Sequence, residues 1–511
     1  QPQKITGVEV LPLTLPALVG NEASALLKLK IETRGQLNPI SLTELHASLA
    51  SETHLSDLTS VHVSHSGGQD RFPKSRPVAS LDAKQVGNKP LVFSLSDHPS
   101  KLVEGTNYIW LSCSLSKQAN IDHLIGIACR KLIFSNGESF KLNQAPSIQR
   151  MGVAVRNGGD DGVNTYRIPG LATTNKNTLI GVYDVRRRSG GDLPGDIEVG
   201  MSRSTDGGRT WGAQQVIMDM GTFRGMPQEV NGCSDPGIIV DPETGEIFVF
   251  AVWMNGRAGT HQWNSGGSEP GHEIGRSAQF VMIRSLDDGR TWSKPENMTR
   301  EWKDPRWILY APSPQQGISL RDGTLVMPTQ GRDEADRPFS NLLISQDHGK
   351  SWTVSPAASF GNTECQAVQL ADDSLILNCR TESPTKFRTI AVTRDLGRTW
   401  TPHATNRIGI IEPNCNGSLY RFDYREGGKS KSVLLFANPY SQKSRTNQSI
   451  QVSFDEGKTW PAKHRLLLDE GRGKGYPSLS RVDDRHVGIV YEGSGAHLVF
   501  ERIPIEDLVK R

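Results

Sequence analysis

Short stretches in which apolar and polar residues alternate dominate the first 145 residues. Four of them are ALLKLKIET (25–33), KPLVFSL (89–95), NYIWLSCSL (107–115) and RKLIFS (130–135). Alternation with a period of two puts the apolar side chains of a strand on one face. We therefore expect short strands that pack as a β-sandwich, with turn-rich segments such as SHSGGQDR between them. This region shows no grouping of acid, base and nucleophile, so it is predicted either to bind carbohydrate or only to pack.

A different pattern governs the chain from about residue 147, where an octamer of the form [S/T]-x-D-x-G-x-[T/S]-W recurs. Its five copies are STDGGRTW (204–211), SLDDGRTW (285–292), SQDHGKSW (345–352), TRDLGRTW (393–400) and SFDEGKTW (453–460). In each copy the Asp side chain can bond to the backbone ahead of it and close a turn. The Gly two residues after the Asp can take positive φ at little cost. The Trp supplies a large apolar surface for packing. The octamer is therefore predicted to be a repeated scaffold turn.

The spacing of the octamers predicts a propeller. Their tryptophans lie about 62 residues apart on average, so residues 147–511 hold about six repeating units. A propeller blade is a four-stranded antiparallel sheet of ~40 or more residues. We therefore expect an all-β chain, with a smaller β-sandwich in residues 1–146 and a six-bladed β-propeller in residues 147–511.

The amino-acid composition supports the all-β class and gives no support for nucleic-acid binding or a membrane helix. The 511 residues are 36% hydrophobic and 22% charged, and the 51 glycines favour a turn-rich, all-β protein. The net charge of +3 comes without a long basic block, so charge gives no case for nucleic-acid binding. No apolar run approaches the ~18 residues of a membrane helix. We expect a monomer.

The cysteines and the first residue bear on the compartment. The six cysteines show no CxxC pair and no zinc-ligand spacing, so no metal is expected. We interpret them as buried free thiols, with one structural disulfide as the alternative. The sequence starts at Gln1 without Met, which is typical of an exported chain after removal of a signal peptide and equally of a trimmed chain. We expect a secreted, periplasmic or cell-surface protein.

Three arginines stand outside the repeat. Arg167 lies in NTYRIPGL, Arg380 ends the apolar strand SLILNCR, and Arg445 follows the apolar strand SVLLFANP. Inner strands and loops of a propeller converge on its axis, so these side chains can meet there. A cluster of guanidinium groups is stable only with an anion, and Arg grips carboxylates with paired hydrogen bonds. The three arginines therefore predict a ligand that carries a carboxylate.

At this point the sequence resembles the sialidases. Tyr-Arg-Ile-Pro (166–169) is similar to their Arg-Ile-Pro motif, and the octamers are similar to their Asp boxes. The resemblance covers about residues 147–511. Asp boxes alone also occur in inverting glucanases and sorting receptors, so the combination of both motifs carries the resemblance. Tyr166 stands where many members have Phe.

The resemblance implies roles for particular residues. Arg167, Arg380 and Arg445 match the carboxylate-binding triad, Asp192 matches the acid/base, Tyr476 the nucleophile, and Glu364 the partner of that nucleophile. Arg186 and Asp235 match positions that contact O4 and the N-acetyl side of the sugar, and Gln330 matches a glycerol-side contact of some bacterial members. Several neighbours remain as alternatives: Arg187 and Arg188 for Arg186, Asp196 for Asp192, Tyr491 for Tyr476, Glu334 and Glu382 for Glu364. Trp253 is predicted to be a core residue rather than part of an N-acetyl pocket.

The implied function is an exo-α-sialidase that removes terminal sialic acid from glycoconjugates with retention, through a covalent tyrosyl intermediate. Sialidases differ from most retaining glycosidases in using tyrosine. A neutral phenol avoids the charge repulsion that a carboxylate nucleophile meets beside the carboxylate of the sugar, and an adjacent Glu accepts its proton. The partners implied are sialylated glycans, and no cofactor is needed. A trans-sialidase and a non-catalytic sialic-acid-binding propeller remain as alternatives.

Overall fold

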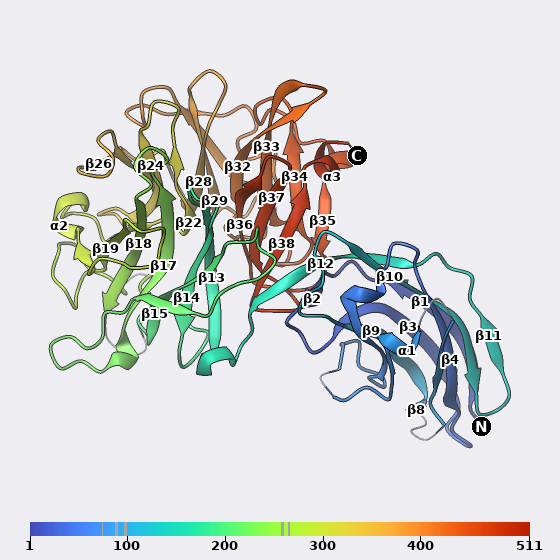
Figure 1. Cartoon of the computed structure of the whole chain (residues 1–511). Coiled ribbons are helices and arrows are strands. Elements are labelled where there is room, and N and C mark those ends of the chain that lie inside the picture. Colours follow the sequence, from blue (N-terminus) through green and yellow to red (C-terminus); the bar gives the residue numbers. More distant parts are fainter. Residues whose placement is uncertain (74, 87–89, 97–99, 257–259, 264–265, 511) are drawn as a thin grey trace. The chain divides into compact units, whose positions relative to one another are not determined.

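Strands make up most of the ordered structure, which confirms the all-β prediction. The structure is a computed structural model that describes residues 1–73, 75–86, 90–96, 100–256, 260–263 and 266–510 (Figure 1). The α-helices in these residues are single turns, namely α1 (Ala83–Val86), α2 (Thr299–Trp302) and α3 (Glu506–Val509). None of the helices in this part of the chain has the length or apolar character to span a bilayer.

The chain divides into two compact units. One comprises residues 1–154 with 468–471, and the other comprises residues 155–467 with 472–511. The sequence placed the boundary after residue 146, at the start of strand β12 (Ser147–Arg156), whereas the units divide near the end of that strand.

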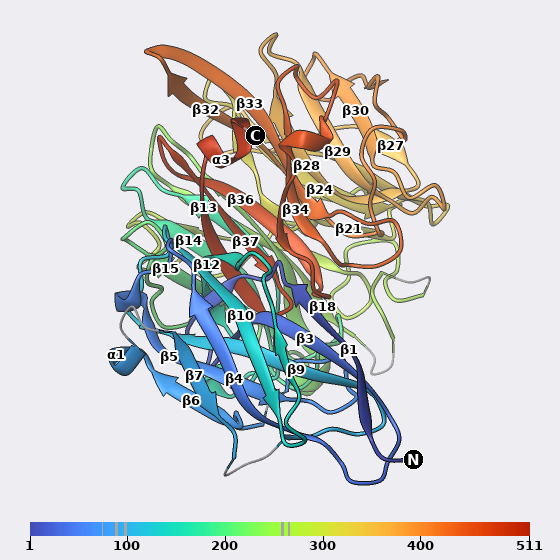
Figure 2. The ribbon, with the colours of Figure 1, turned by 90° about the vertical axis from the view of Figure 1, so that its right-hand side faces the viewer.

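The first unit contains two sheets (Figure 2). One has the order β1 (Lys4–Pro12), β3 (Ser24–Arg34), β9 (Gly105–Leu115), β5 (Leu58–His65), β6 (Ala79–Asp82). The other contains β12, β10 (Leu124–Phe134), β4 (Ser41–Leu49) and β7 (Leu91–Ser94), with the short β2 (Ala17–Val19), β8 (Ser100–Lys101) and β11 (Ser139–Lys141) at its sides.

The two sheets pack together, as predicted for a β-sandwich. Strand β10 of one sheet contacts β3 of the other. Along β3, Leu27, Leu29 and Ile31 are buried while the residues between them are partly exposed. The predicted strands 25–33, 107–115 and 130–135 lie within β3, β9 and β10, apart from residue 135, and the segment 89–95 forms β7, with residue 89 outside the described residues.

Six groups of mainly antiparallel strands form the described part of the second unit. The first is β13 (Thr165–Thr173), β14 (Leu179–Arg186), β15 (Ile197–Ser204), β16 (Gln215–Met218). The second is β17 (Asn231–Val240), β18 (Ile247–Asn255), β19 (Gln279–Ser285), β20 (Glu296–Asn297), with β22 (Gln315–Gln316) parallel to β17. The third is β21 (Leu309–Pro312), β24 (Leu325–Arg332), β25 (Pro338–Ser345), β26 (Thr353–Val354), with β23 (Ile318–Ser319) and β27 (Ser359–Phe360).

The last three groups follow the same plan. The fourth is β28 (Asn362–Gln369), β29 (Leu375–Thr381), β30 (Thr389–Thr393), β31 (Thr401–Pro402). The fifth is β32 (Ser418–Glu426), β33 (Lys429–Pro439), β34 (Gln448–Ser453), β35 (Leu466–Asp469), and the sixth contains β36 (Gly475–Asp483), β37 (His486–Glu492), β38 (Leu498–Pro504).

These groups close into a ring, which is the architecture of a propeller. Strand β13 contacts β17 on one side and β36 on the other, and β32 contacts β28 and β36. Strand β24 links the ring between β17 and β28. The apolar clusters lie between successive sheets: Ile180 and Val182 of β14 pack with Val249 of β18 in one of them. Similar clusters lie between the second and third, third and fourth, and fourth and fifth sheets, so successive sheets pack through apolar faces.

The octamers form the turns that lead to the outermost strand of five sheets, as the sequence predicts. In the first copy the Asp206 carboxylate accepts bonds from the backbone N and the hydroxyl of Thr210, at 3.0 and 2.6 Å. The Gly208 backbone N donates to the Ser204 hydroxyl at 2.9 Å, and Trp211 donates to the Gly208 carbonyl. The Asp–Thr or Asp–Ser bonds recur in the other four copies.

The turns also pack against the neighbouring sheet. The ring of Trp211 lies 5.2 Å from that of Phe500 in β38, and the ring of Trp352 lies 5.7 Å from that of Phe248 in β18. The octamers therefore contribute to the contacts between sheets as well as to the turns.

All six cysteines are buried and unpaired. This agrees with the interpretation as free thiols rather than with the structural disulfide.

Replacing Gly208 by Ala should destabilise the propeller more than the same change at Gly428. Both glycines have positive φ, +87° and +79°, so each substitution costs about 1 kcal/mol in backbone conformation. A Cβ on Gly208 would lie 2.0 Å from the Phe500 ring, whereas Gly428 has no neighbour within 4 Å. We expect a further loss of about 1–3 kcal/mol for Gly208→Ala. Urea unfolding followed by tryptophan fluorescence measures it, and equal losses in the two variants would contradict the packing argument.

Candidate active site

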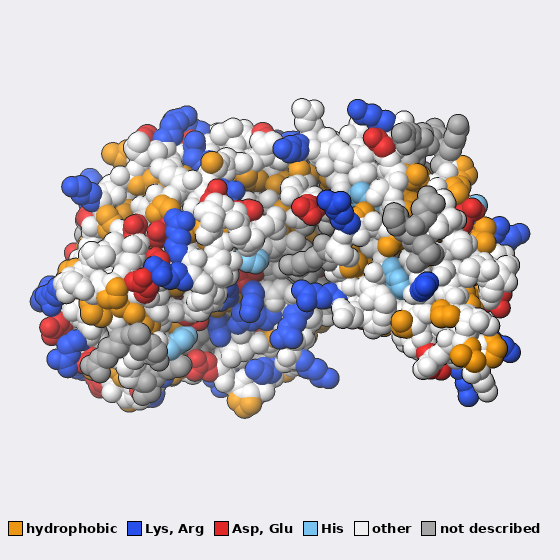
Figure 3. Space-filling view, turned by 90° about the horizontal axis from the view of Figure 1, so that it is seen from below, with side chains coloured by type: hydrophobic (Ala, Val, Ile, Leu, Met, Phe, Trp, Pro, Cys, Tyr) orange, Lys and Arg blue, Asp and Glu red, His pale blue; other side chains and the backbone are white. Residues whose placement is uncertain are grey.

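One hollow of the propeller unit gathers most of the predicted site residues. It has a volume of about 430 Å³, within the range of small-ligand sites. Eight of the nine predicted residues line it: Arg167, Asp192, Asp235, Gln330, Glu364, Arg380, Arg445 and Tyr476. Seen from below, Lys and Arg side chains gather around a hollow in this unit (Figure 3).

Irregular backbone on the inner strands aims several of these side chains. The register of β13 shifts between Arg167 and Gly170, that of β17 between Ser234 and Gly237, and that of β36 between Gly475 and Ser478. A fourth shift brackets Glu364 in β28. Bulges of this kind bend a strand and redirect a side chain, and they are frequent next to active sites.

Three of the bulges contain a residue with positive φ. Ile168, Asp235 and Tyr476 have φ of +55°, +57° and +48°. Such conformations cost about 1–3 kcal/mol for residues other than Gly, and the surrounding structure must maintain them. Each of the three precedes a Pro in the sequence. Proline has no N–H, so it leaves no unpaired donor where the ladder is broken.

The three predicted arginines surround one phenol. The guanidinium carbons of Arg167 and Arg445 lie 5.2 and 5.3 Å from the centre of the Tyr476 ring. Arg380 donates to the Tyr476 hydroxyl at 3.0 Å. Arg167 comes from β13, Arg380 from β29 and Arg445 from the segment after β33, so residues from three separate sheets meet at this point.

Fixed partners hold the arginines. Arg167 donates through Nε to Glu492 at 3.2 Å, and the backbone N of Ile168 donates to the same carboxylate at 2.6 Å. Arg445 donates only to the carbonyls of Lys474 and Asn414, at 3.1 and 3.0 Å, and has no carboxylate partner in the described chain. Glu492 was not among the predicted site residues. It ends the apolar strand HVGIVYE, where a charge needs a partner, and that signal had already identified Arg380.

Tyr476 and Glu364 form a hydrogen-bonded pair. The Tyr476 hydroxyl donates to Glu364 Oε1 at 2.5 Å, and Arg380 donates to the other Glu364 oxygen at 2.7 Å. Burial and the Glu364 carboxylate raise the pKa of Tyr476 well above its ordinary value, while the three guanidinium groups oppose that rise. The phenol is therefore neutral and has a proton acceptor in direct contact.

Asp192 lies in a positively charged environment. Arg186 donates to it at 2.6 Å, His261 Nε2 lies 3.2 Å from its other oxygen, and Arg167 lies 3.6 Å away. Burial raises the pKa of Asp192, but the hydrogen bond with His261 and the charges of Arg186 and Arg167 outweigh it. The pKa of this carboxyl group is therefore below its usual value, and the group is ionised when no anionic ligand is bound.

Arg186 lies behind the hollow rather than in its lining. It is 1% exposed and donates to Asp184, to the carbonyls of Gly190 and Gly191, and to Asp192. It therefore positions the Asp192 loop. Its side chain does not line the hollow, so a direct contact with a ligand, as predicted, is not seen in this arrangement. Arg187 points elsewhere and pairs with Glu198 at 2.5 Å.

Asp235 contributes a carboxyl group that favours its neutral form. Its backbone N donates to the buried Asp184 at 3.0 Å. Burial raises the pKa of Asp235 well above its ordinary value, and the charges of Asp184 and Glu364 raise it further. A neutral carboxyl group can donate a hydrogen bond to a ligand oxygen. Gln330 also lines the hollow, and its amide donates to the Pro312 carbonyl at 3.2 Å.

The hollow is also lined by residues that were not predicted from the sequence to belong to the site. His261, Trp263, Arg332 and Thr363 line it, and so does Glu382, which had been named only as an alternative to Glu364. His261 and Trp263 follow β18 in a loop that has no repeat or motif, so no signal in the sequence marked them.

The remaining alternatives lie elsewhere. Asp196 pairs with Arg188 at 3.1 Å, Glu334 lies 3.6 Å from Arg306, and the Tyr491 hydroxyl donates to Glu501 at 2.8 Å. Trp253 is 4% exposed in an apolar cluster and donates to Asn231, which agrees with its prediction as a core residue.

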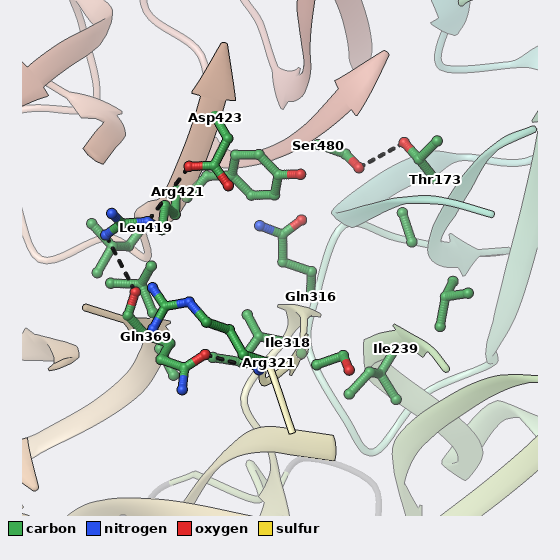
Figure 4. A pocket seen from close by; sticks show the side chains of 17 residues that line it. Thr173, Ile239, Gln316, Ile318, Arg321, Gln369, Leu419, Arg421, Asp423 and Ser480 are labelled. Carbon is green, nitrogen blue, oxygen red and sulfur yellow. Dashed lines mark hydrogen bonds and ion pairs between the residues drawn. The ribbon is translucent and has the colours of Figure 1, made fainter. Parts of the chain in front are cut away.

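A second hollow lies at the opposite ends of the inner strands (Figure 4). Thr173, Gln369 and Ser480 belong to it, and they follow Arg167, Glu364 and Tyr476 on the same strands. Its arginines have partners: Arg421 pairs with Glu456 at 2.9 Å and Arg321 with Asp373 at 2.5 Å. This hollow has neither an unpaired guanidinium group nor a phenol bonded to a carboxylate among its described residues, so the first hollow is the candidate active site.

Known proteins resemble the chain over both units. Residues 188–491 match the family model for the BNR repeat-like domain, and residues 6–138 match that for the N-terminal domain of BNR-repeat neuraminidase. A sialidase of Bacteroides fragilis is 35% identical over 97% of this chain and 94% of its own length. The solved structure of the Hadza microbial sialidase Hz136 superposes with a TM-score of 0.89 at 33% identity, covering 98% of this chain and all of that one.

A more distant structure shares the fold alone. The intramolecular trans-sialidase from Ruminococcus gnavus in complex with oseltamivir carboxylate has a TM-score of 0.55 at 20% identity, over 69% of this chain and 97% of that one. The family models, together with the full-length similarity, show that the chain belongs to the BNR-repeat sialidase family of glycoside hydrolases.

Proposed function

We propose that the protein is a retaining exo-α-sialidase that hydrolyses terminal sialic acid from glycans through a covalent intermediate on Tyr476. The observation that carries the proposal is the Tyr476–Glu364 hydrogen bond of 2.5 Å inside a ring of three guanidinium groups. A phenol with a carboxylate in contact is an activated nucleophile, and the arginines fit a sugar that carries a carboxylate.

Charge explains how the substrate is held. Two carboxylates, Glu364 and Glu492, bond to Arg380 and Arg167, whereas Arg445 bonds only to carbonyl groups. Arg445 is therefore the member of the triad that is available to the carboxylate of the sugar. Bidentate bonds from guanidinium groups fix its orientation as well as its position. The anomeric carbon C2, to which this carboxylate is attached, is thereby held next to the Tyr476 oxygen.

In the first step the Tyr476 oxygen attacks C2 and its proton passes to Glu364 Oε1. The bond between C2 and the glycosidic oxygen breaks, and Asp192 donates a proton to the departing oxygen. In the second step a water attacks C2, Asp192 accepts a proton from that water, and the C2–Tyr476 bond breaks. Glu364 then returns its proton to the phenolate. Two displacements at C2 give net retention.

Substrate binding prepares Asp192 for its role as an acid. The free carboxyl group is ionised because His261, Arg186 and Arg167 lower its pKa. When the carboxylate of the sugar binds Arg167, it offsets one of these charges, and the pKa of Asp192 rises toward the value that a general acid requires. The ligand therefore supplies part of the charge balance that its own cleavage needs.

The stereochemistry of the product tests the proposal. Proton NMR during hydrolysis of α2,3-sialyllactose should show the α-anomer of free sialic acid first, with the β-anomer accumulating only by later mutarotation. Initial release of the β-anomer would exclude a double displacement, and no release by pure protein would favour a non-catalytic binding propeller.

The same experiment with excess lactosamine detects transfer, because a sialylated lactosamine product would indicate a trans-sialidase.

Tyr476→Phe removes the attacking oxygen and leaves the ring between Arg167 and Arg445. We expect kcat on aryl and natural sialosides to fall by at least about 1,000-fold, since the covalent route is closed, while binding of a sialic-acid analogue changes little. Steady-state kinetics and calorimetric titration measure the two effects. Tyr491→Phe is the matched control, because the Tyr491 hydroxyl bonds to Glu501 outside the hollow. Turnover of Tyr476→Phe near the wild-type rate would reject Tyr476 as the nucleophile.

Asp192→Asn should affect substrates according to their leaving groups. A lactose leaving group needs a proton, whereas a nitrophenolate leaves without one, so kcat/KM should fall about 100-fold more for sialyllactose than for a nitrophenyl sialoside. The bonds from Arg186 to the carbonyls of Gly190 and Gly191 keep the loop in place in the variant. Equal losses on both substrates would show that Asp192 is not the general acid.

A further inference from the structure

A basic hollow adjoins the candidate active site. It has a volume of about 780 Å³ and shares Arg167 and Arg445 with the active-site hollow. The other cations that line it are Lys443, Arg472 and Lys474, next to His497, and its one carboxylate is Glu492. The two hollows therefore meet at two arginines of the triad.

The positive charge of the basic hollow is not neutralised by the protein. Lys443, Arg472 and Lys474 are exposed, and their side chains have no carboxylate partner in the described chain. Glu492 is already bonded to Arg167 and to the backbone N of Ile168. Several other exposed arginines of this unit are paired: Arg188 with Asp196, Arg321 with Asp373, and Arg394 with Asp372.

The chemistry of the substrate places the aglycone, the part of the glycan that leaves, beside this charge. In a sialoside the carboxylate and the glycosidic oxygen are both attached to C2. If Arg167 and Arg445 hold the carboxylate, the aglycone begins within two bonds of it. Gly190 lines the basic hollow and lies two residues before the proposed acid Asp192, so the departing sugar passes this wall. A hollow of this size accepts one further sugar ring.

We propose that the basic hollow is an aglycone subsite that selects substrates with an anionic group on the sugar next to the terminal sialic acid. That group is a carboxylate, as in a second sialic acid, or a sulfate ester. The inference rests on the proposed sialidase function and adds a preference for acidic aglycones. Lys443, Arg472 and Lys474 are specificity residues in this proposal, since they touch the aglycone and not the reacting atoms.

Two matched substrate pairs test the proposal with the full-length protein. One pair is α2,3-sialyllactosamine with and without a sulfate on galactose O6. The other is the α2,8-linked sialic acid dimer and the same dimer with its reducing-end carboxylate converted to an amide. For at least one pair we expect kcat/KM to be about tenfold higher for the charged member at low salt, as three exposed ionic contacts allow. At about 0.5 M salt the ratio should fall toward one, because exposed charges are screened.

Variants locate the effect. In Lys443→Ala/Arg472→Ala/Lys474→Ala the ratio should fall to about one at low salt, and in Lys443→Glu/Lys474→Glu it should fall below one. Lys429→Ala is the matched control, because Lys429 is an exposed cation of the same unit that lines neither hollow, and it should keep the wild-type ratio. A response confined to one pair identifies the carboxylate or the sulfate as the group recognised.

Two results would overturn the inference: a ratio of one for both pairs in the wild-type protein, or a wild-type ratio that persists in the triple variant. Release of sialic acid from the uncharged member of each pair separates this failure from failure of the proposed function. If the wild-type protein releases none from any substrate, the sialidase proposal itself is wrong.

Discussion

Three guanidinium groups held around one phenol are the arrangement on which the rest of this structure depends. Like charges in a partly buried space repel, so fixed anions must lie beside them. Glu492 and Glu364 compensate Arg167 and Arg380, whereas Arg445 meets only carbonyl groups. Arg445 is therefore the one arginine of the three without a carboxylate partner among the described residues. In the proposed function, the carboxylate of the sugar takes that place.

The propeller makes this arrangement rigid. Closure of the ring places inner strands of successive sheets against one another. The octamer turns contribute further contacts between sheets, as Trp211 does with Phe500. Bulges at Ile168, Asp235 and Tyr476 then redirect side chains from regular strands into the hollow. The positive φ values at these bulges cost free energy, and they persist only where the surrounding structure is stable. The repeated turns therefore support the site by stabilising the sheets that carry it.

The ionisable side chains of the free site differ in their protonation states. Positive neighbours keep Asp192 ionised, whereas burial keeps Asp235 and Tyr476 neutral. In the proposed function, an incoming carboxylate raises the pKa of Asp192 and leaves Tyr476 in contact with Glu364. The same positive field extends into the basic hollow, where the protein provides fewer anions than cations. In our proposals, these positive charges act on the carboxylate of the sugar, on the acid that protonates the departing oxygen and on the next residue of the glycan.

By itself the sequence determined the all-β class, the repeated turns and most residue types of the site, because periodicity and turn chemistry are local and the motifs are short. It did not reveal Glu492, His261 or the placement of Arg186 behind Asp192. Arg167 and Glu492 are separated by 325 positions, and only closure of the ring makes them neighbours. The positive φ of Tyr476 likewise has no local cause, because a following proline favours extended backbone with negative φ. Tertiary structure decided these features because they depend on which residues meet at the axis, and no periodicity along the chain encodes that.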